Sequence, residues 1–219
     1  MRRSHDNEAS PTKRGYPIFA ALYDVMGASA ERRWMGERRR RLLAEARGAV
    51  LEIGGGTGAN LPHYRAVDRV VVTEPDPFMR KRIGQKLADA CIPVEVSAAG
   101  AEMLPFPDGS FDTVVSTLVL CTVPDQESAL DEIRRILRPG GRLLFIEHVR
   151  AAGSAARWQD RLDPLWRRLF GGCRPNRDTI ASIEETGFEI ETFESFRSPD
   201  PLSGLTPYVQ GSAMVRLAA

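Results

Sequence analysis

Apolar residues recur along the chain in short runs that are separated by stretches with helical spacing. The short runs predict seven strands, near 49–53, 69–74, 93–97, 112–117, 142–148, 188–196 and 210–217. The stretches before and between them predict helices near 18–26, 30–46, 59–64, 77–90, 126–138, 154–170 and 176–186. This alternation predicts an α/β fold with a doubly wound, seven-stranded and mostly parallel sheet.

Proline, glycine and serine residues refine the predicted boundaries of these helices and strands. Pro139-Gly140-Gly141 is expected to end one helix and to turn into the strand that follows. Residues 197–209 are rich in Ser, Pro and Gly and leave no room for a crossover helix, so the last strand should be antiparallel. Residues 1–15 predict a flexible polar tail, and 16–219 predict a single domain whose N-terminal helices occupy 16–46.

Composition narrows the class of protein. A chain of 219 residues with 42% hydrophobic residues can bury one sizeable core and is short for two. A formal net charge of +1 gives no overall attraction to nucleic acid. No signal peptide is evident, and no segment reaches the roughly 20 apolar residues of a membrane span.

The three cysteines, Cys91, Cys121 and Cys173, are far apart along the chain. They form neither a CxxC pair nor a cluster with the spacing of zinc ligands. Free thiols in a reducing cytoplasm fit this usage best, and no metal site is expected.

The most informative segment is the glycine-rich turn that follows the first strand. Glycine adopts positive φ freely and lets the backbone approach a nucleotide-like cofactor closely. The turn also satisfies a loose dinucleotide fingerprint, which would bind a pyrophosphate. Glu52 favours S-adenosylmethionine (SAM) over NAD, because a carboxylate repels a pyrophosphate and attracts the ammonium group of SAM. The candidate cofactor residues here are Glu52, Gly54, Gly56, Gly58 and Asn60.

A second candidate lies about 20 residues beyond Gly54, where Glu74 and Pro75 end the second strand. An acid at that place can accept hydrogen bonds from both ribose hydroxyls of an adenosine cofactor, whether NAD or SAM. Glu74 could instead be a helix N-terminal acid, although Asp76 is better placed to cap that helix.

The stretch Ala99–Asp112 closely resembles the segment after the third strand of class I SAM-dependent methyltransferases. Ile136-Leu137-Arg138-Pro139-Gly140-Gly141 and the glycine turn extend the resemblance in the expected order. It implies a Rossmann-like fold, SAM as cofactor, and recognition of the adenine by Ala101 and Glu102. Many relatives carry an Asp where Gly100 or Ala101 stands, so Glu102 could alternatively be a plain loop charge.

The second half resembles the methyltransferase-like family that includes the animal alkyl-thiol S-methyltransferases. Five stretches carry this resemblance: Thr117–Val123, Glu147–Val149, Leu162–Trp166, Gly172-Cys173 with Arg177-Asp178 soon after, and Pro207–Gly211. It implies methyl transfer to a small hydrophobic thiol or a related soft nucleophile. Relatives also methylate oxygen, nitrogen or carbon of lipids, quinones and secondary metabolites, and a non-catalytic SAM-binding protein would share the same cofactor motifs. The animal proteins begin with a membrane-anchoring segment, whereas this chain begins with a polar tail.

In a doubly wound sheet, ligands bind beyond the carboxyl ends of the strands. Thr117 and Leu118, at the end of the fourth strand, are therefore cofactor candidates. His148 leaves the fifth strand on the same side and is the catalytic candidate, since it could assist a thiol acceptor; it could equally fix a loop. Cys121 is interpreted as a small apolar wall of the pocket, and Cys173 as a structural or lid residue.

Residues 153–175 predict a lid over the acceptor pocket. Trp158, Leu162, Leu165, Leu169 and Phe170 recur at helical spacing, and Pro164 should kink or split the helix. With Phe19, Tyr23 and Trp34 this stripe could line an apolar acceptor pocket, or it could be ordinary core.

The arginine run 38–41 is interpreted as a solvated helix face, because glutamates are interspersed with it. Contact with a membrane surface is the less favoured alternative. The aromatic and basic pattern of nucleic-acid-binding surfaces is missing, and the sequence leaves the oligomeric state open.

Overall fold

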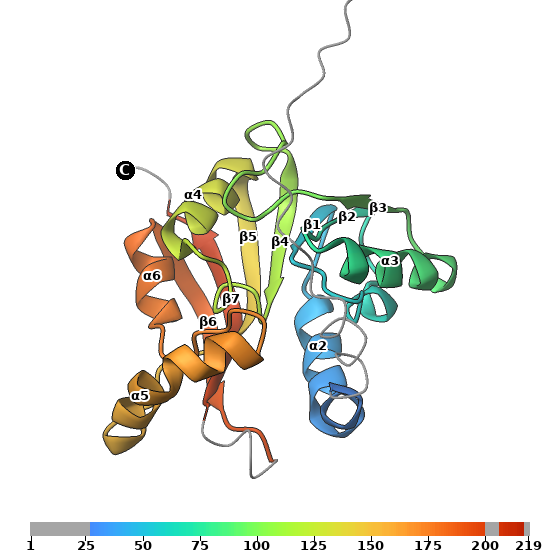
Figure 1. Ribbon diagram of the computed structural model, residues 1–219. Coiled ribbons are helices and arrows are strands. Elements are labelled where there is room, and N and C mark those ends of the chain that lie inside the picture. The colour runs from blue at the N-terminus through green and yellow to red at the C-terminus, as the bar shows by residue number, and fades with distance from the viewer. Residues whose placement is uncertain (1–26, 200–205, 217–219) are drawn as a thin grey trace, which may run out of the picture.

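The structure, a computed structural model, describes residues 27–199 and 206–216. The predicted tail, the predicted helix near 18–26, Phe19 and Tyr23 lie outside the described residues. The helical elements are η1 (Glu31–Met35, π-helical), α2 (Gly36–Leu43), η2 (Leu61–His63, 3-10), α3 (Pro77–Lys86), η3 (Leu87–Asp89, 3-10), α4 (Gln126–Ile136), α5 (Ser154–Leu169) and α6 (Thr179–Glu185) (Figure 1). The strands are β1 (Ala49–Ile53), β2 (Arg69–Thr73), β3 (Val94–Ser97), β4 (Phe111–Thr117), β5 (Leu137–His148), β6 (Phe188–Phe196) and β7 (Tyr208–Val215).

The strands form one seven-stranded sheet in the order β3-β2-β1-β4-β5-β7-β6. Strands β1 to β5 pair in parallel, and β7 pairs antiparallel with both β5 and β6. The predicted Rossmann-like sheet with an antiparallel last strand is confirmed. The strand order reverses between β1 and β4, so the carboxyl ends of these two strands mark the place where such sheets bind ligands.

The two faces of the sheet carry separate apolar clusters, because successive side chains of a strand point to opposite faces. On one face, Leu51 and Phe145 belong to a cluster with Ile133 of α4 and Ile183 of α6. On the other face, the cluster includes residues of β1, β2 and β5 together with α2 and α3. Figure 1 shows α4 and α6 on one side of the sheet and α2 and α3 on the other.

Three expected boundaries change in the structure. The helix expected near 59–64 is a single 3-10 turn, η2, which contains Pro62 and therefore lacks one backbone donor. β5 begins at Leu137, five residues before the expected start, because a residue that precedes proline, here Arg138, prefers extended backbone. α5 runs unbroken from Ser154 to Leu169 with Pro164 inside it, so the proline does not split the helix.

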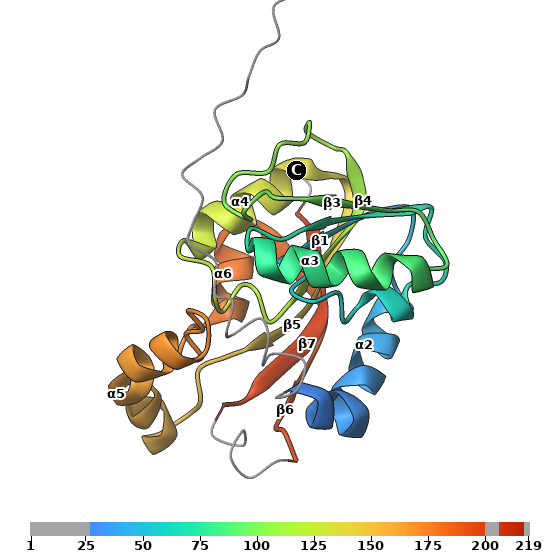
Figure 2. The same ribbon diagram turned by 45° about the vertical axis from the view of Figure 1, so that its right-hand side comes forward.

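α5 follows β5 at the carboxyl end of that strand. In both views it extends outward from the body of the protein, below α6 (Figure 1, Figure 2). Among the described residues, no helix combines the length and the apolar character needed to cross a membrane.

Candidate active site

The glycine turn after β1 has a backbone conformation that requires glycine. Gly54, Gly56 and Gly58 have φ values of 55°, 56° and 80°, which L side chains rarely adopt. A Cβ on Gly54 would also lie 2.7 Å from both γ-carbons of Val119, in the loop after β4. The turn is thus packed against the loop after β4, and both its positive φ and this close contact require glycine at Gly54.

Glu52 lies below this turn at the end of β1 and is almost fully buried. The hydroxyl of Tyr64 donates a hydrogen bond to Glu52 Oε2 at 2.7 Å. Burial nevertheless raises the pKa of Glu52 to about 7, with nearby Glu74 adding to the rise. The carboxyl group is thus poised between its two protonation states near neutral pH, and a cation beside it would favour the charged form.

Glu74 contacts the glycine turn directly. Its Oε2 accepts a hydrogen bond from the backbone N–H of Gly56 at 2.8 Å, and its Oε1 accepts one from that of Asp76 at 2.8 Å. Burial raises the pKa of Glu74 against these two hydrogen bonds. Asp76 accepts from the N–H groups of Phe78 and Met79 and caps α3, as expected, while Pro75 is exposed.

A buried arginine joins the ends of β1 and β4. Arg39 Nη1 donates to Asn60 Oδ1 at 2.7 Å and to Thr117 Oγ1 at 2.9 Å, while Asn60 Nδ2 donates to the same hydroxyl at 3.0 Å. Arg39 Nε also pairs with Glu31 at 3.2 Å. The structure therefore brings the predicted cofactor residues Asn60 and Thr117 together around a guanidinium group.

The interpretation of residues 38–41 as a solvated face is wrong at Arg39, which is only 6% exposed. Arg40 and Arg41 fit it, since they are exposed and pair with Glu37. The missed signal is spacing: position 39 lies three residues before Leu42 and so shares the apolar face of α2.

The loop after β4 is held by one carboxylate. Glu147 of β5 is fully buried and accepts a hydrogen bond from Ser116 Oγ at 2.7 Å. It also accepts from the backbone N–H groups of residues 119–121, at 3.0, 3.1 and 3.1 Å. Just before them, Leu118 has a φ of 61°, a strained value for a branched residue. Burial raises the pKa of Glu147, and these four hydrogen bonds oppose the rise.

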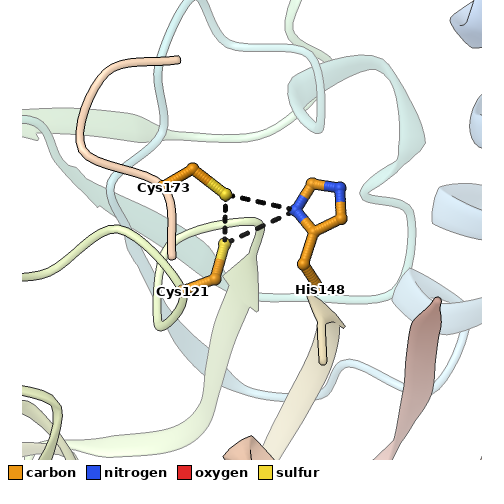
Figure 3. A group of neighbouring side chains, drawn as sticks. All are labelled: Cys121, His148 and Cys173. Carbon is orange, nitrogen blue, oxygen red and sulfur yellow. Dashed lines mark hydrogen bonds between the residues drawn. The ribbon is translucent and has the colours of Figure 1, made fainter. Parts of the chain in front are cut away.

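Cys121, His148 and Cys173 meet beyond the carboxyl ends of β4 and β5 (Figure 3). Cys121 Sγ and Cys173 Sγ lie 3.7 Å apart, and each lies 3.6 Å from His148 Nδ1. Both cysteines are buried and His148 is half-buried, with its ring centroid 4.4 Å from that of Tyr208. The sequence spacing gave no sign of this cluster, because the fold joins positions 27 and 52 residues apart.

The two thiols have different environments. The hydrogen bond with Cys121 and a further one with His148 lower the pKa of Cys173, although burial opposes them. The hydrogen bond with Cys173 and complete burial raise the pKa of Cys121 well above its usual value. The interpretation of Cys121 as an apolar wall therefore misses its sulfur and nitrogen neighbours.

The predicted adenine contacts lie in the turn after β3. Ala101 is buried in the apolar core, and Glu102 is half-buried in the turn after β3. A Cβ added at Gly100 would lie 3.2 Å from a carboxylate oxygen of Glu102. The adenine role of Ala101 and Glu102 remains a prediction.

The apolar stripe of α5 is not ordinary core. Trp158, Leu165 and Leu169 are 58%, 56% and 57% exposed. The buried side of α5 is held by Gln159. Its Oε1 accepts a hydrogen bond from Ala151 N at 2.7 Å, and its Nε2 donates one to Pro175 O at 3.1 Å. α5 thus presents an apolar surface while its base is fixed beside the cysteine cluster.

Comparison with known proteins assigns this chain to a family. The family described as "Methyltransferase domain" matches residues 51–145. Human thiol S-methyltransferase TMT1A is 35% identical over 211 residues, which cover 92% of this chain and 86% of TMT1A. The chain belongs to the family of SAM-dependent methyltransferases that includes TMT1A. This SAM-dependent methyltransferase is also similar to the ubiquinone/menaquinone biosynthesis C-methyltransferase UbiE of Marinomonas sp. (strain MWYL1), at 27% identity over 87% of each chain.

The fold of this methyltransferase recurs in solved structures. Geranyl diphosphate C-methyltransferase from Streptomyces coelicolor A3(2), solved with S-adenosyl-L-homocysteine, superposes with a TM-score of 0.68. It is 14% identical, and the match covers 94% of this chain and 90% of that one. The cofactor of the methyltransferase is SAM, not NAD, and the family supports an enzyme over the non-catalytic alternative.

Replacement of Glu147 by Gln should destabilise the protein. An amide keeps one acceptor oxygen but directs an NH₂ group at backbone donors, so buried N–H groups lose their partner. We expect the free energy of unfolding to fall by about 2–3 kcal/mol. Chemical denaturation of the purified variant measures this change.

Glu189→Gln is the matched control, since Glu189 is exposed on β6. Its stability should stay within about 0.5 kcal/mol of the parent protein. Equal stability of the two variants would show that the Glu147 hydrogen bonds do not hold the loop.

Proposed function

We propose that this methyltransferase transfers the methyl group of SAM directly and in line to the sulfur of a small hydrophobic thiol. One observation carries the proposal. Three of the stretches that resemble alkyl-thiol S-methyltransferases supply Cys121, His148 and Cys173, and these side chains meet within 3.7 Å of one another. The imidazole of His148 can accept a hydrogen bond from an acceptor thiol held beside this cluster.

The loop 118–121 supports a short path between cofactor and acceptor. At one end, Val119 packs against Gly54 of the cofactor turn. At the other end, Cys121 faces His148. An acceptor held beside the cluster would therefore lie next to the cofactor, which is the proximity that in-line transfer requires.

The proposed cofactor contacts follow the charges of SAM. Its amino-acid end is zwitterionic, and buried Glu52 and Arg39 offer the opposite charges, one for the ammonium and one for the carboxylate. Glu74 is proposed to accept the ribose hydroxyls, and Ala101 and Glu102 to contact the adenine edge. The remaining predicted contacts are Gly54, Gly56, Gly58, Asn60, Pro75, Thr117 and Leu118.

SAM supplies an already activated methyl group on a sulfonium, so the protein's own groups chiefly orient the acceptor and exclude water. The acceptor sulfur forms a bond to the methyl carbon while the bond from that carbon to the sulfonium breaks. The electron pair stays on the departing sulfur, and the thiol proton passes to solvent. His148 is proposed to contact the acceptor sulfur.

Residues 153–175 are proposed to cover the acceptor. The exposed stripe with Trp158, Leu165 and Leu169 gives α5 an apolar surface for a hydrophobic substrate. Cys91, Cys121 and Cys173 are free, which supports a reducing compartment, and we propose the cytoplasm.

Methylation of carbon on a quinol is the second candidate. The similarity to UbiE over most of the chain favours it. Methylation of oxygen or nitrogen on a lipid or secondary metabolite belongs to the same group of alternatives.

The proposal predicts thiol-dependent release of S-adenosylhomocysteine. Purified protein and SAM would be incubated with a series of small alkyl thiols and, in parallel, with the alcohols that have the same carbon skeletons. Each thiol and its matched alcohol differ only in the acceptor atom, sulfur or oxygen. Turnover should occur with the thiols and not with the matched alcohols. Liquid chromatography with mass spectrometry measures both S-adenosylhomocysteine and the methyl thioether.

Phenol, amine and quinol acceptors complete the panel. Turnover with a quinol alone would replace the thiol by carbon methylation. A product methylated on oxygen or nitrogen would equally contradict the thiol proposal while leaving SAM-dependent methyl transfer intact.

The proposed role of Glu52 predicts a pH-dependent affinity for SAM. Because burial raises its pKa to about 7, Glu52 is mostly neutral at pH 6 and mostly charged at pH 7.5. Only the charged form attracts the ammonium of SAM, so affinity should rise roughly eightfold between these pH values, as the charged fraction does. Isothermal titration calorimetry measures the dissociation constant.

Glu52→Gln should bind SAM more weakly and lose this rise. Glu95→Gln, a change at an exposed acid on β3, should keep both affinity and rise. A Glu52→Gln variant with the parent pH profile would remove Glu52 from the cofactor site.

A further inference from the structure

We propose that Cys121, Cys173 and His148 bind a zinc ion whose fourth coordination position receives the acceptor thiol as a thiolate. The identity of the fourth ligand rests on the proposed thiol methylation. The three protein ligands rest on the geometry of the cluster alone.

The distances in the cluster are those of a tetrahedral zinc site. With Zn–S bonds of about 2.3 Å and a Zn–N bond of about 2.05 Å, neighbouring ligand atoms of a tetrahedron lie roughly 3.8 Å apart for two sulfurs and 3.6 Å for sulfur and nitrogen. The observed separations are 3.7 Å between the sulfurs and 3.6 Å from each sulfur to His148 Nδ1. All three edges of the triangle thus match one face of the tetrahedron.

The donor set also matches a catalytic rather than a structural zinc site. Structural sites close the tetrahedron with four protein ligands, whereas catalytic sites use three, as in Cys₂His, and leave one position open. Among the described residues, the potential metal ligands that gather here are Cys121, His148 and Cys173. The open position would accept an exogenous ligand.

Surrounding groups hold the ligands in place. Glu147 fixes the backbone of Cys121 through a hydrogen bond of 3.1 Å, and the N–H of Arg174 donates to Cys121 O at 2.7 Å. The ring of Tyr208 packs on His148. Trp166 Nε1 is buried without a hydrogen-bond acceptor of good geometry and lies beside Cys173. A buried indole donor next to a sulfur suits a thiolate ligand, whose negative charge it stabilises.

The positions of the two sulfur atoms do not fit a disulfide between Cys121 and Cys173. A disulfide requires sulfurs about 2.05 Å apart, whereas these lie 3.7 Å apart with His148 Nδ1 equidistant from both. Cys91 is exposed and provides a cysteine outside the cluster.

The bound zinc would change the reactivity of the acceptor. The alkyl thiol loses its proton to solvent as its sulfur binds the metal, since metal binding requires the thiolate. That sulfur then forms the bond to the methyl carbon as the carbon–sulfonium bond breaks. The neutral thioether is a weaker ligand than the thiolate and leaves the zinc, so the position opens again.

Metal analysis of the purified protein tests the site. The protein would be prepared without chelator and dialysed against metal-free buffer. Inductively coupled plasma mass spectrometry should then find about one zinc ion per chain, as expected of one catalytic zinc site. Cys173→Ser should lower the zinc content about tenfold or more. Cys91→Ser should retain the parent content.

Folding of the ligand variants is checked by SAM affinity. Should Cys173→Ser fail to fold, His148→Gln provides the second ligand variant. A parent protein that holds no more zinc than a folded ligand variant overturns the site. A Cys121–Cys173 disulfide found by mass spectrometry in protein purified under reducing conditions also overturns it.

Cobalt substitution tests the fourth position. Co²⁺ in a tetrahedral site with two thiolates should give thiolate-to-metal charge transfer and intense visible d–d bands. A small alkyl thiol should shift these bands and the alcohol of the same skeleton should not. Unchanged bands with the thiol overturn its coordination.

Turnover separates this inference from the proposed function. Chelator-treated, zinc-free protein should lose thiol methylation and regain it when zinc is restored. Full thiol methylation by zinc-free protein would overturn the zinc inference and leave the proposed function in place. Zinc binding and thiol-shifted cobalt bands without methylation of any thiol would overturn the proposed function instead, while the metal site would stand.

Discussion

The buried carboxylate of Glu147 is the interaction on which the rest of the site depends. It accepts four hydrogen bonds, three of them from consecutive backbone N–H groups of residues 119–121. A fully buried acid is costly unless its oxygens are satisfied, and a loop with Leu118 at positive φ is strained. Each feature offsets the other: the loop satisfies the acid, and the acid holds the loop in a conformation that its sequence disfavours.

That loop joins the two halves of the chemistry. Its Val119 packs on Gly54, so the cofactor turn takes its position from the end of β4. Its Cys121 faces His148, which directly follows Glu147 on β5. One pair of parallel strands therefore aligns the glycine turn with Cys121 and His148, while Cys173 comes from the segment after α5. Hydrogen bonds from Gln159 to the chain on both sides of α5 hold that segment beside the strands.

Local sequence signals predicted the sheet and the place of the glycine turn, because alternating apolar runs and turn residues act within a few residues. Glu74 at the turn and Asp76 as the cap of α3 follow from that local chemistry. The charged residues around Arg39 predict a solvated face, whereas its spacing from Leu42 places it inside. The cluster of Cys121, His148 and Cys173 depends on contacts between residues 27 and 52 positions apart, and no spacing rule along the chain contains that information.

Methyl donor and acceptor are proposed to meet where the loop after β4 passes between the glycine turn and the cysteine cluster. A crystal structure of the protein with S-adenosylhomocysteine and a small alkyl thiol measures this most directly. It should show the S-adenosylhomocysteine backbone against Gly54 and Gly56, with the thiol sulfur beside Cys121, His148 and Cys173 and facing the sulfur of S-adenosylhomocysteine. A thiol bound away from this cluster, or a cofactor whose sulfur faces away from it, would contradict the account.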